Sequence, residues 1–143
     1  MSVLAYPVHL DVEVRFRDLD SLRHVNNAVF FTYLEMAREA YWNVAGRRLD
    51  LDGFGFILAR AECDFRAPIL AGSAVRVRIR CPRLGGKSWD YEYRVEDRES
   101  GALFAEARSV QVYYHFPSGR THPVPAEVRA AIARLEAPAA ASS

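Results

Sequence analysis

Two hydrophobic periodicities follow one another in the first third of the chain. Between residues 8 and 16 every second residue is apolar, the period of two that a half-buried strand requires. Residues 17–24 break this alternation and supply Asp and Ser, which favour turns and helix starts. From Asn27 onward the apolar residues recur at spacings of three and four, while Arg38, Glu39 and Asn43 fall off that stripe; its members are Phe30, Leu34, Ala37, Tyr41 and Val44. This predicts an amphipathic helix of about five turns.

Gly46 is a plausible C-terminal stop for this helix, and Arg47 and Arg48 would favour the negative end of its dipole. After a loop containing Gly53 and Gly55, the period of two returns. It predicts strands over 59–65, 75–81 and 89–95, with a turn from Pro82 to Gly86 between the last two. An extended stretch over 103–114 alternates more weakly, which favours a central strand covered on both faces.

A short Ala/Arg-rich helix is expected after Pro123 and Pro125, reaching about Leu135, and residues 137–143 are expected to fray. The order of elements predicts an α+β fold in a single domain, residues 1–143, with an antiparallel sheet and one helix available to cover one face. That arrangement leaves the other surface and the edge strands in need of burial. We therefore expect dimerisation through strand pairing.

Composition narrows the class of protein. Nineteen basic and eighteen acidic side chains give a formal charge of +1, which offers no general attraction to nucleic acid or to an anionic membrane. No apolar run approaches the ~18 residues that span a bilayer, and residues 1–7 lack the features of a signal peptide. Cys63 and Cys81 sit within apolar alternations, which favours reduced core thiols. We expect a cytoplasmic protein.

The segment between the first strand and the long helix has the densest polar functionality in the chain. A helix start presents unpaired backbone N–H groups that can stabilise an oxyanion, and a carboxylate a few residues earlier can act on the same carbonyl. That carboxylate can attack directly or serve as general base for water. Spacing alone favours the simpler role in which Asp20 or Ser21 caps the helix or closes a turn. Asp18 and Asp20 have no third ligand at metal-binding spacing, so no metal is expected.

Three stretches read together carry a resemblance: Arg15-Phe16-Arg17-Asp18-Leu19-Asp20, His24-Val25-Asn26-Asn27 and Tyr33-Leu34-Glu35-Met36-Ala37-Arg38. They resemble the 4-hydroxybenzoyl-CoA thioesterase family of hot-dog proteins, especially its long-chain acyl-CoA thioesterase branch. Residues 64–68 followed by Gly72 look like that family's second strand and exit turn, and the resemblance is weak after about His115. The resemblance implies a five-stranded antiparallel sheet wrapped around one long central helix, with a short C-terminal helix here.

The resemblance also implies roles for individual residues. Asp20 matches the family's catalytic carboxylate, and the backbone N–H of Asn27 matches its oxyanion donor. Glu35 matches an acidic helix position and is expected in the pocket wall or behind the reacting groups, unless it merely pairs with Arg38. The expected substrate-binding residues are His24, Asn26, Phe31, Tyr33, Arg83, Lys87 and Ser88. The family usually has glycine before the His-Val-Asn-Asn stretch, whereas this chain has Arg23, so the loop is expected to differ in shape.

These residues predict an acyl-CoA thioesterase that releases a carboxylic acid and free coenzyme A, with no metal or redox cofactor. Two alternatives stay open: hydrolysis of acyl groups on acyl carrier protein, and a non-catalytic acyl-CoA binding module, which Arg23 favours and Asp20 opposes. A homodimer or homotetramer is expected, with the site between subunits. The sequence leaves the length and the aliphatic or aromatic nature of the acyl group open.

Overall fold

The computed structural model describes residues 5–45 and 52–137. The expected helix stop at Gly46, the arginines after it, residues 1–4 and the tail from 138 onward lie outside these residues. The strands are β1 (Val8–Glu13), β2 (Phe54–Phe65), β3 (Ala74–Leu84), β4 (Ser88–Asp97), β5 (Leu103–His115) and β6 (Arg120–Thr121). The helices are a 3₁₀ turn (Phe16–Asp18), α1 (Asn27–Val44) and α2 (Ala126–Glu136).

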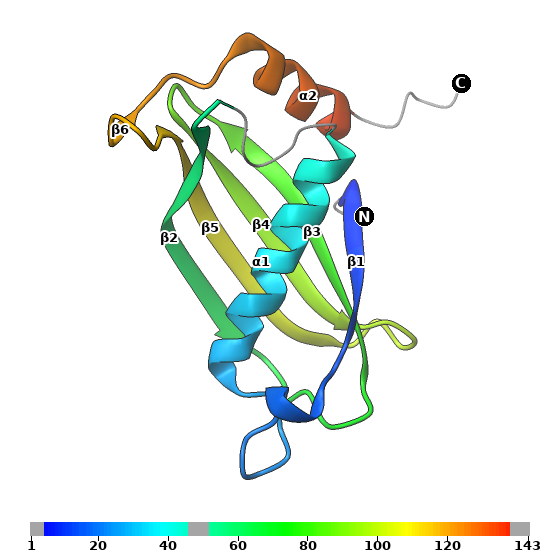
Figure 1. Ribbon diagram of the computed structural model, residues 1–143. Coiled ribbons are helices and arrows are strands. Elements are labelled where there is room, and N and C mark those ends of the chain that lie inside the picture. Colours follow the sequence, from blue (N-terminus) through cyan, green and yellow to red (C-terminus); the bar gives the residue numbers. More distant parts are fainter. Residues whose placement is uncertain (1–4, 46–51, 138–143) are drawn as a thin grey trace, which may run out of the picture.

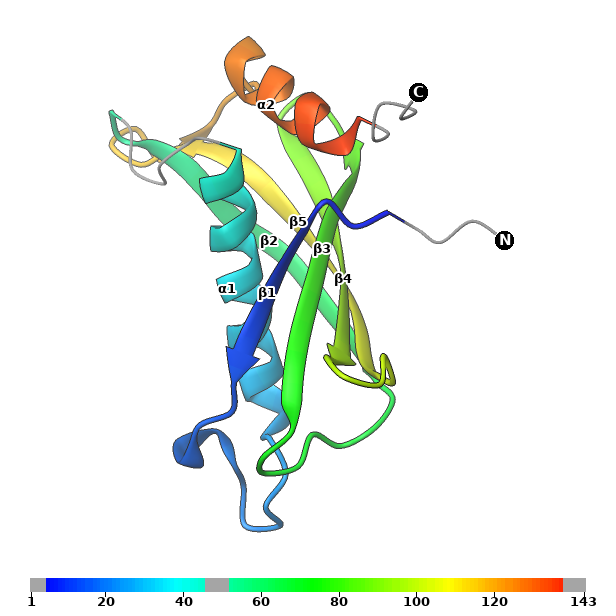
Figure 2. The same ribbon diagram turned by 90° about the vertical axis from the view of Figure 1, so that its right-hand side faces the viewer.

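One antiparallel sheet curves around α1. Its strand order is β1-β3-β4-β5-β2, and the two-residue strand β6 adds to β5. Figure 1 shows α1 lying along the hollow face of the sheet, and Figure 2 shows the strands curving around it from the other side. The predicted α+β hot-dog fold is confirmed, with β6 as an addition to the five expected strands.

The core forms where the apolar stripe of α1 meets the inward side chains of the sheet. Alternate residues of β3 and β4 are buried, as the period of two predicts, and Trp42 of α1 stacks on Trp89 of β4 with ring centroids 5.9 Å apart. The largest fully buried side chains include Tyr33, Tyr41, Tyr91, Phe30, Leu34 and Ile79. This aromatic core fixes α1 over the sheet and thereby fixes the loop that enters it.

Four local predictions need correction. Arg38, which falls off the apolar stripe, is buried, because α1 is covered on a broader arc than the stripe suggests. Val44, the last residue of α1, is 58% exposed although it belongs to the stripe. β2 begins at Phe54, five residues before the expected start. Pro82 lies inside β3, where a register shift between Arg80 and Arg83 accommodates a residue that has no N–H to donate.

The outer face of the sheet is polar. Arg76 pairs with Asp11 at 2.8 Å, and Arg78 and Arg94 both bond Glu96, at 3.0 and 2.7 Å. On β5 the outward residues Glu106 and Arg108 are exposed, so in the single chain β5 is an internal strand but is not covered on both faces. A lattice of paired charges is a surface that water solvates, and this face does not need an apolar cover.

Candidate active site

The loop between β1 and α1 is anchored by a buried carboxylate. The Asp18 side chain is 3% exposed and accepts hydrogen bonds from the Arg15 N–H at 2.9 Å and the Tyr33 hydroxyl at 2.8 Å. The carbonyl oxygen of Asp18 accepts the Asn26 N–H at 2.9 Å. Burial and the hydrogen bond to Asp18 raise the pKa of Tyr33, so its hydroxyl stays a donor. These bonds join both ends of the loop to the core.

Asp20 lies in the exposed part of this loop. Its Oδ1 atom accepts the Leu22 N–H at 2.9 Å and the His24 N–H at 3.2 Å, and the Asp20 N–H donates to the His24 carbonyl at 2.8 Å. Asp20 therefore closes the turn, as spacing alone allowed, and does so with one carboxylate oxygen. Within residues 5–45 and 52–137 no donor bonds the other oxygen, Oδ2, which remains available to a reactant.

Arg23 occupies the tip of the turn with φ of +64°, in the left-handed region. This conformation is easy for glycine and costs other residues about 1–2 kcal/mol. Arg23 takes up a backbone conformation suited to glycine, held by its N–H bond to the Asp20 carbonyl at 3.0 Å; the expected difference in loop shape stays a prediction. The arginine changes the strain of the loop while the turn still closes on Asp20.

The first turn of α1 leaves one backbone donor free beside this loop. Asn26 is the N-cap: its side-chain oxygen accepts the Ala28 N–H at 2.8 Å, and its carbonyl accepts the Val29 N–H at 2.8 Å. Among the described residues nothing accepts the Asn27 N–H, which is the donor that a helix start leaves unpaired. The cap is thus Asn26, and neither Asp20 nor Ser21 fills that position.

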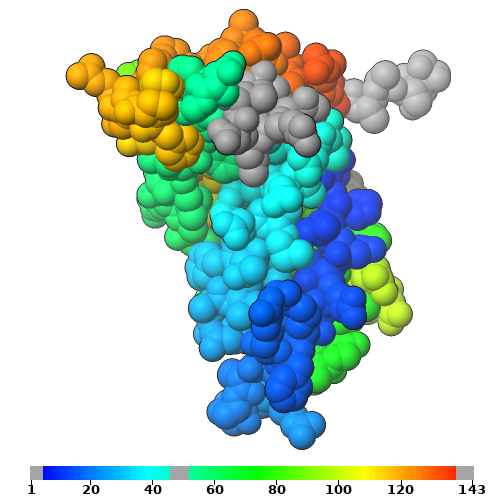
Figure 3. Space-filling model, in the orientation of Figure 1, coloured from blue at the N-terminus to red at the C-terminus, as the bar shows by residue number. Residues whose placement is uncertain are grey.

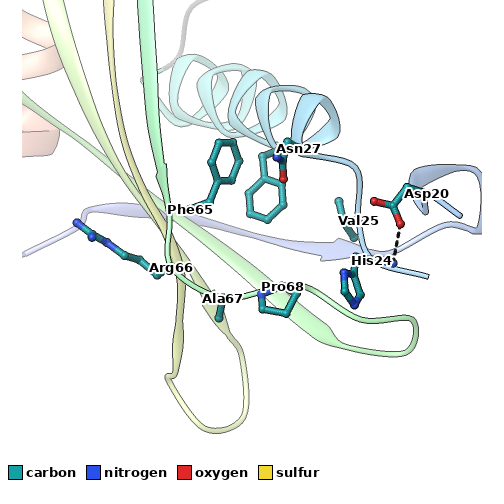
Figure 4. Close-up of a pocket in the computed structure, with 9 residues that line it drawn as sticks. Asp20, His24, Val25, Asn27, Phe65, Arg66, Ala67 and Pro68 are labelled. Carbon is teal, nitrogen blue, oxygen red and sulfur yellow. Dashed lines mark hydrogen bonds between the residues drawn. The ribbon is translucent and has the colours of Figure 1, made fainter. Parts of the chain in front are cut away.

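Asp20 and Asn27 line the same pocket, of about 400 Å³, between the loop and the exit of β2. Figure 4 shows Asp20 and His24 on one side and Asn27 and Phe65 toward the helix. The other lining residues are Val25, Phe30, Arg66, Ala67 and Pro68. The pocket therefore combines a carboxylate, a free helix N-terminal N–H and an aromatic wall, the parts that attack on an ester-like carbonyl requires.

The sequence missed the contribution of residues 65–68 to this pocket. They were identified as the end of a strand and its turn, and a hydrogen bond from the Val25 N–H to the Ile69 carbonyl, 2.8 Å long, brings that turn against the loop. In Figure 4 the Arg66 side chain points away from Asp20, and it bonds Glu106 on β5 at 3.2 Å. No signal along the sequence indicates which loop the turn will meet.

Other predicted site residues lie outside this pocket in the structure. Tyr33 is buried in the core on Asp18, so the structure does not bring it to the pocket. Phe31 is partly exposed on α1 outside the pocket. Glu35 is exposed and lines a second pocket farther along α1, together with Arg38. Asn26 acts on the helix backbone instead of lining the cavity.

The predicted coenzyme-binding residues lie at the opposite end of the molecule. The turn between β3 and β4 carries Lys87 and packs against α2, whose Arg129 donates to the Gly85 carbonyl at 2.6 Å. Arg83 bonds Asp90 at 2.7 Å and Ser88 at 3.1 Å. Figure 1 shows this turn beside α2, far from the start of α1. One chain cannot bring Arg83, Lys87 and Ser88 to the Asp20 pocket.

No group of three or more His, Cys, Asp or Glu side chains able to hold a metal ion is found among residues 5–45 and 52–137. None of the helices in the described part of the chain is long and apolar enough to cross a membrane.

Comparisons with known proteins agree with the fold. A model of the Thioesterase-like superfamily matches residues 14–132. A crystal structure of a thioesterase from Thermus thermophilus, complexed with coenzyme A and Zn, shares 39% identity, covers 94% of this chain and 97% of that one, and superposes with a TM-score of 0.81.

Two curated proteins also match. The 1,4-dihydroxy-2-naphthoyl-CoA hydrolase of Synechocystis is 27% identical over 117 residues, 76% of this chain and 84% of that protein. YsmA of Bacillus subtilis, described as uncharacterized, is 25% identical over 96 residues, which is 67% of this chain and 65% of that protein.

Proposed function

Because this chain belongs to the Thioesterase-like superfamily, we propose that it is an acyl-CoA thioesterase, which hydrolyses an acyl-CoA to a carboxylic acid and free coenzyme A. The observation that carries the proposal is the single pocket lined by both Asp20, whose Oδ2 accepts no hydrogen bond from the described residues, and Asn27, whose N–H has no acceptor among them. Two relatives support the choice of thioester, since one was crystallised with coenzyme A and the other is named as a hydrolase of an aromatic acyl-CoA.

The two groups divide the chemistry between them. The Asn27 N–H, at the positive end of the α1 dipole, donates a hydrogen bond to the thioester carbonyl and stabilises the oxyanion that forms on it. Asp20 either attacks the carbonyl carbon, expelling the thiolate and leaving a mixed anhydride that water cleaves, or removes a proton from a water that attacks the same carbon. In both routes the C–S bond breaks and the thiolate leaves as the thiol. Neither route uses a metal or redox cofactor.

Asp20 is oriented for this task by its own loop. The Leu22 and His24 N–H groups hold Oδ1, so the side chain needs little reorganisation before Oδ2 meets the substrate. His24 lines the pocket beside it and is proposed to contact the substrate. The Arg23 N–H bonds the Asp20 carbonyl within the turn that positions Asp20, which supports catalysis over a non-catalytic binding module.

We propose that the active form is a dimer built through β2. β2 is an edge of the sheet, and large apolar side chains are exposed on β2 itself, on α1 and after β5: Leu58 and Phe65, Phe31 and Met36, and Phe116. Figure 3 shows α1 open to solvent on the face away from the sheet. A second copy that pairs its β2 antiparallel to this one covers that surface and removes the edge.

Such pairing has a consequence for the site. β2 runs from Phe56 and Leu58, in the second pocket, to Phe65, in the Asp20 pocket. Antiparallel pairing of two copies therefore sets the second pocket of one subunit next to the Asp20 pocket of the other. Substitution Leu58→Asp, which puts a charge on this edge, is expected to give monomers without activity in sedimentation velocity and turnover assays. An active native monomer would contradict the shared site; assembly of dimers into tetramers stays a prediction.

A cytoplasmic location is proposed on the basis of Cys63 and Cys81, which are both unpaired thiols in the structure.

The test of the proposed function is thiol release from a panel of short, long and aromatic acyl-CoAs. We expect turnover of at least one class, and competition by free coenzyme A. Binding of acyl-CoA without turnover of any member would instead support the binding module. Faster turnover of the same acyl group on acyl carrier protein would favour the carrier protein as substrate.

A further inference from the structure

Arg38 is a buried cation that the proposed reaction does not use. It lies on α1 and is 7% exposed, and its Nη1 donates to the Tyr93 hydroxyl on β4 at 3.1 Å. Among the described residues no carboxylate lies within ion-pair distance of it. A buried guanidinium without a counter-charge is costly, because it loses water and gains only one hydrogen bond in return.

A polar chain behind Arg38 fixes its orientation. The Tyr93 hydroxyl shares a hydrogen bond with Ser109, Ser109 donates to Gln111, and Gln111 donates to the Trp89 carbonyl at 3.2 Å. All of these groups are buried between α1 and the sheet. This series of hydrogen bonds holds one edge of the guanidinium in place. The remaining N–H donors of Arg38 are available to a ligand in the neighbouring space.

That space is the second pocket, of about 340 Å³, which Arg38 lines. Its walls are the apolar side chains of Phe56, Leu58 and Phe116, and the exposed carboxylates of Glu35 and Glu39 stand at its rim. A cavity with apolar walls and one fixed donor selects a largely apolar ligand that carries a single acceptor. The two rim carboxylates disfavour a carboxylate ligand, whereas a hydroxyl can accept from Arg38 and donate to a rim carboxylate.

We infer that Arg38 determines specificity for acyl groups that carry a hydroxyl at a distance from the thioester, and that the second pocket holds this hydroxylated end. The inference rests on the proposed function. In the proposed dimer the pocket adjoins the partner's reacting groups. Along one chain Arg38 follows Asn27 by about 16 Å of helix rise, and it lines a separate pocket.

The test uses matched substrate pairs. Straight-chain acyl-CoAs of six to twelve carbons are compared with their terminally hydroxylated and terminally carboxylated counterparts, for the native protein, Arg38→Met and Arg38→Lys. The control is Arg98→Met, which removes an exposed arginine paired with Asp11 on the outer face. Because each result is a ratio of kcat/KM values within one protein, partial unfolding of a variant does not alter it.

The native protein is expected to prefer the hydroxylated member of at least one pair by about tenfold or more, the effect of one hydrogen bond to a charged group. Arg38→Met should bring that ratio to about one while retaining turnover of the plain acyl-CoA, and Arg38→Lys should restore part of it. Arg98→Met should keep the native ratio.

Four results would overturn the inference. If the native protein hydrolyses plain acyl-CoAs without preferring the hydroxylated member at any length, the inference is contradicted and the proposed function is not. Preference for the carboxylated member has the same meaning. If Arg38→Met lowers kcat/KM equally for both members of each pair and the dimer dissociates in sedimentation, Arg38 acts at the subunit interface instead. Absence of turnover on every substrate would contradict both the proposed function and the inference about Arg38.

Discussion

Removing one hydroxyl from Tyr33 should destabilise the loop that carries Asp20. In Tyr33→Phe the ring keeps its place in the core, and the buried Asp18 carboxylate loses the donor that lies 2.8 Å away. The Arg15 N–H remains, but its guanidinium stands 3.8 Å from Asp18 and is half exposed, so it replaces little of the lost bond. A hydrogen bond to a buried charged group contributes about 1.5–3 kcal/mol.

The chain offers a matched control in Tyr91→Phe. Tyr91, on β4, is as deeply buried, but its hydroxyl makes no contact with hydrogen-bond geometry within the described part of the chain. Burial raises the pKa of Tyr91 more than the Trp89 ring N–H lowers it, so at most a weak bond is lost with the hydroxyl. Deleting that hydroxyl removes an unsatisfied polar group, which should leave stability unchanged or raise it by about 1 kcal/mol. The same chemical change is thus expected to have opposite effects at the two sites.

Thermal unfolding at fixed protein concentration distinguishes them. Tyr33→Phe should lower Tm by about 5–9 °C, and Tyr91→Phe should not lower it. The Tyr33 variant should also lose kcat/KM, because Asp18 ties both ends of the catalytic loop together. Equal losses of stability in the two variants would refute the reasoning, since both effects would then come from ring packing alone.

Three further predictions concern other parts of the structure. Arg23→Gly should raise the free energy of unfolding by about 0.5–1 kcal/mol in urea titrations, because glycine adopts φ of +64° without strain; a loss would show that the side chain stabilises the loop. Asn26→Ala should lower it by about 1 kcal/mol, because the Ala28 N–H loses its cap; an unchanged midpoint would contradict the cap. Burial raises the pKa of Glu136, so stability should fall as pH rises from about 4.5 through that raised pKa. Glu136→Gln should lack this fall, because glutamine does not ionise but can still accept the Tyr41 hydroxyl. The prediction is contradicted if the free energy of unfolding changes equally between pH 4.5 and pH 7.5 in the native protein and in Glu136→Gln.

Local pattern was enough for most of the fold. The strands of the β3–β4 hairpin follow from alternation, and α1 begins where the periodicity begins, at Asn27, because Asn26 is a good N-cap. Pattern failed where tertiary contacts override it. Arg38 is buried because Tyr93, 55 residues later, accepts its hydrogen bond, and no local period encodes that distance.

The candidate site divides in the same way. The juxtaposition of Asp20 and Asn27 is local, since the turn and the cap between them are made by neighbouring residues. The pocket wall at residues 65–68 depends on the meeting of two loops, and the separation of Arg83 and Lys87 from Asp20 depends on strand direction. The resemblance implies one site that contains Asp20, Arg83 and Lys87, although a single chain keeps them apart. In the proposed dimer these residues can come from different subunits.

The kcat/KM of Asp20→Asn for the best acyl-CoA of the panel tests the central claim most directly. Asparagine keeps an oxygen to accept the Leu22 and His24 N–H groups, so the loop should keep its shape while the reacting charge is lost. We predict a decrease of at least about a hundredfold, with Tm and acyl-CoA binding close to native. A folded variant that turns over the same substrate within a few-fold of the native rate would show that Asp20 is not the reacting carboxylate.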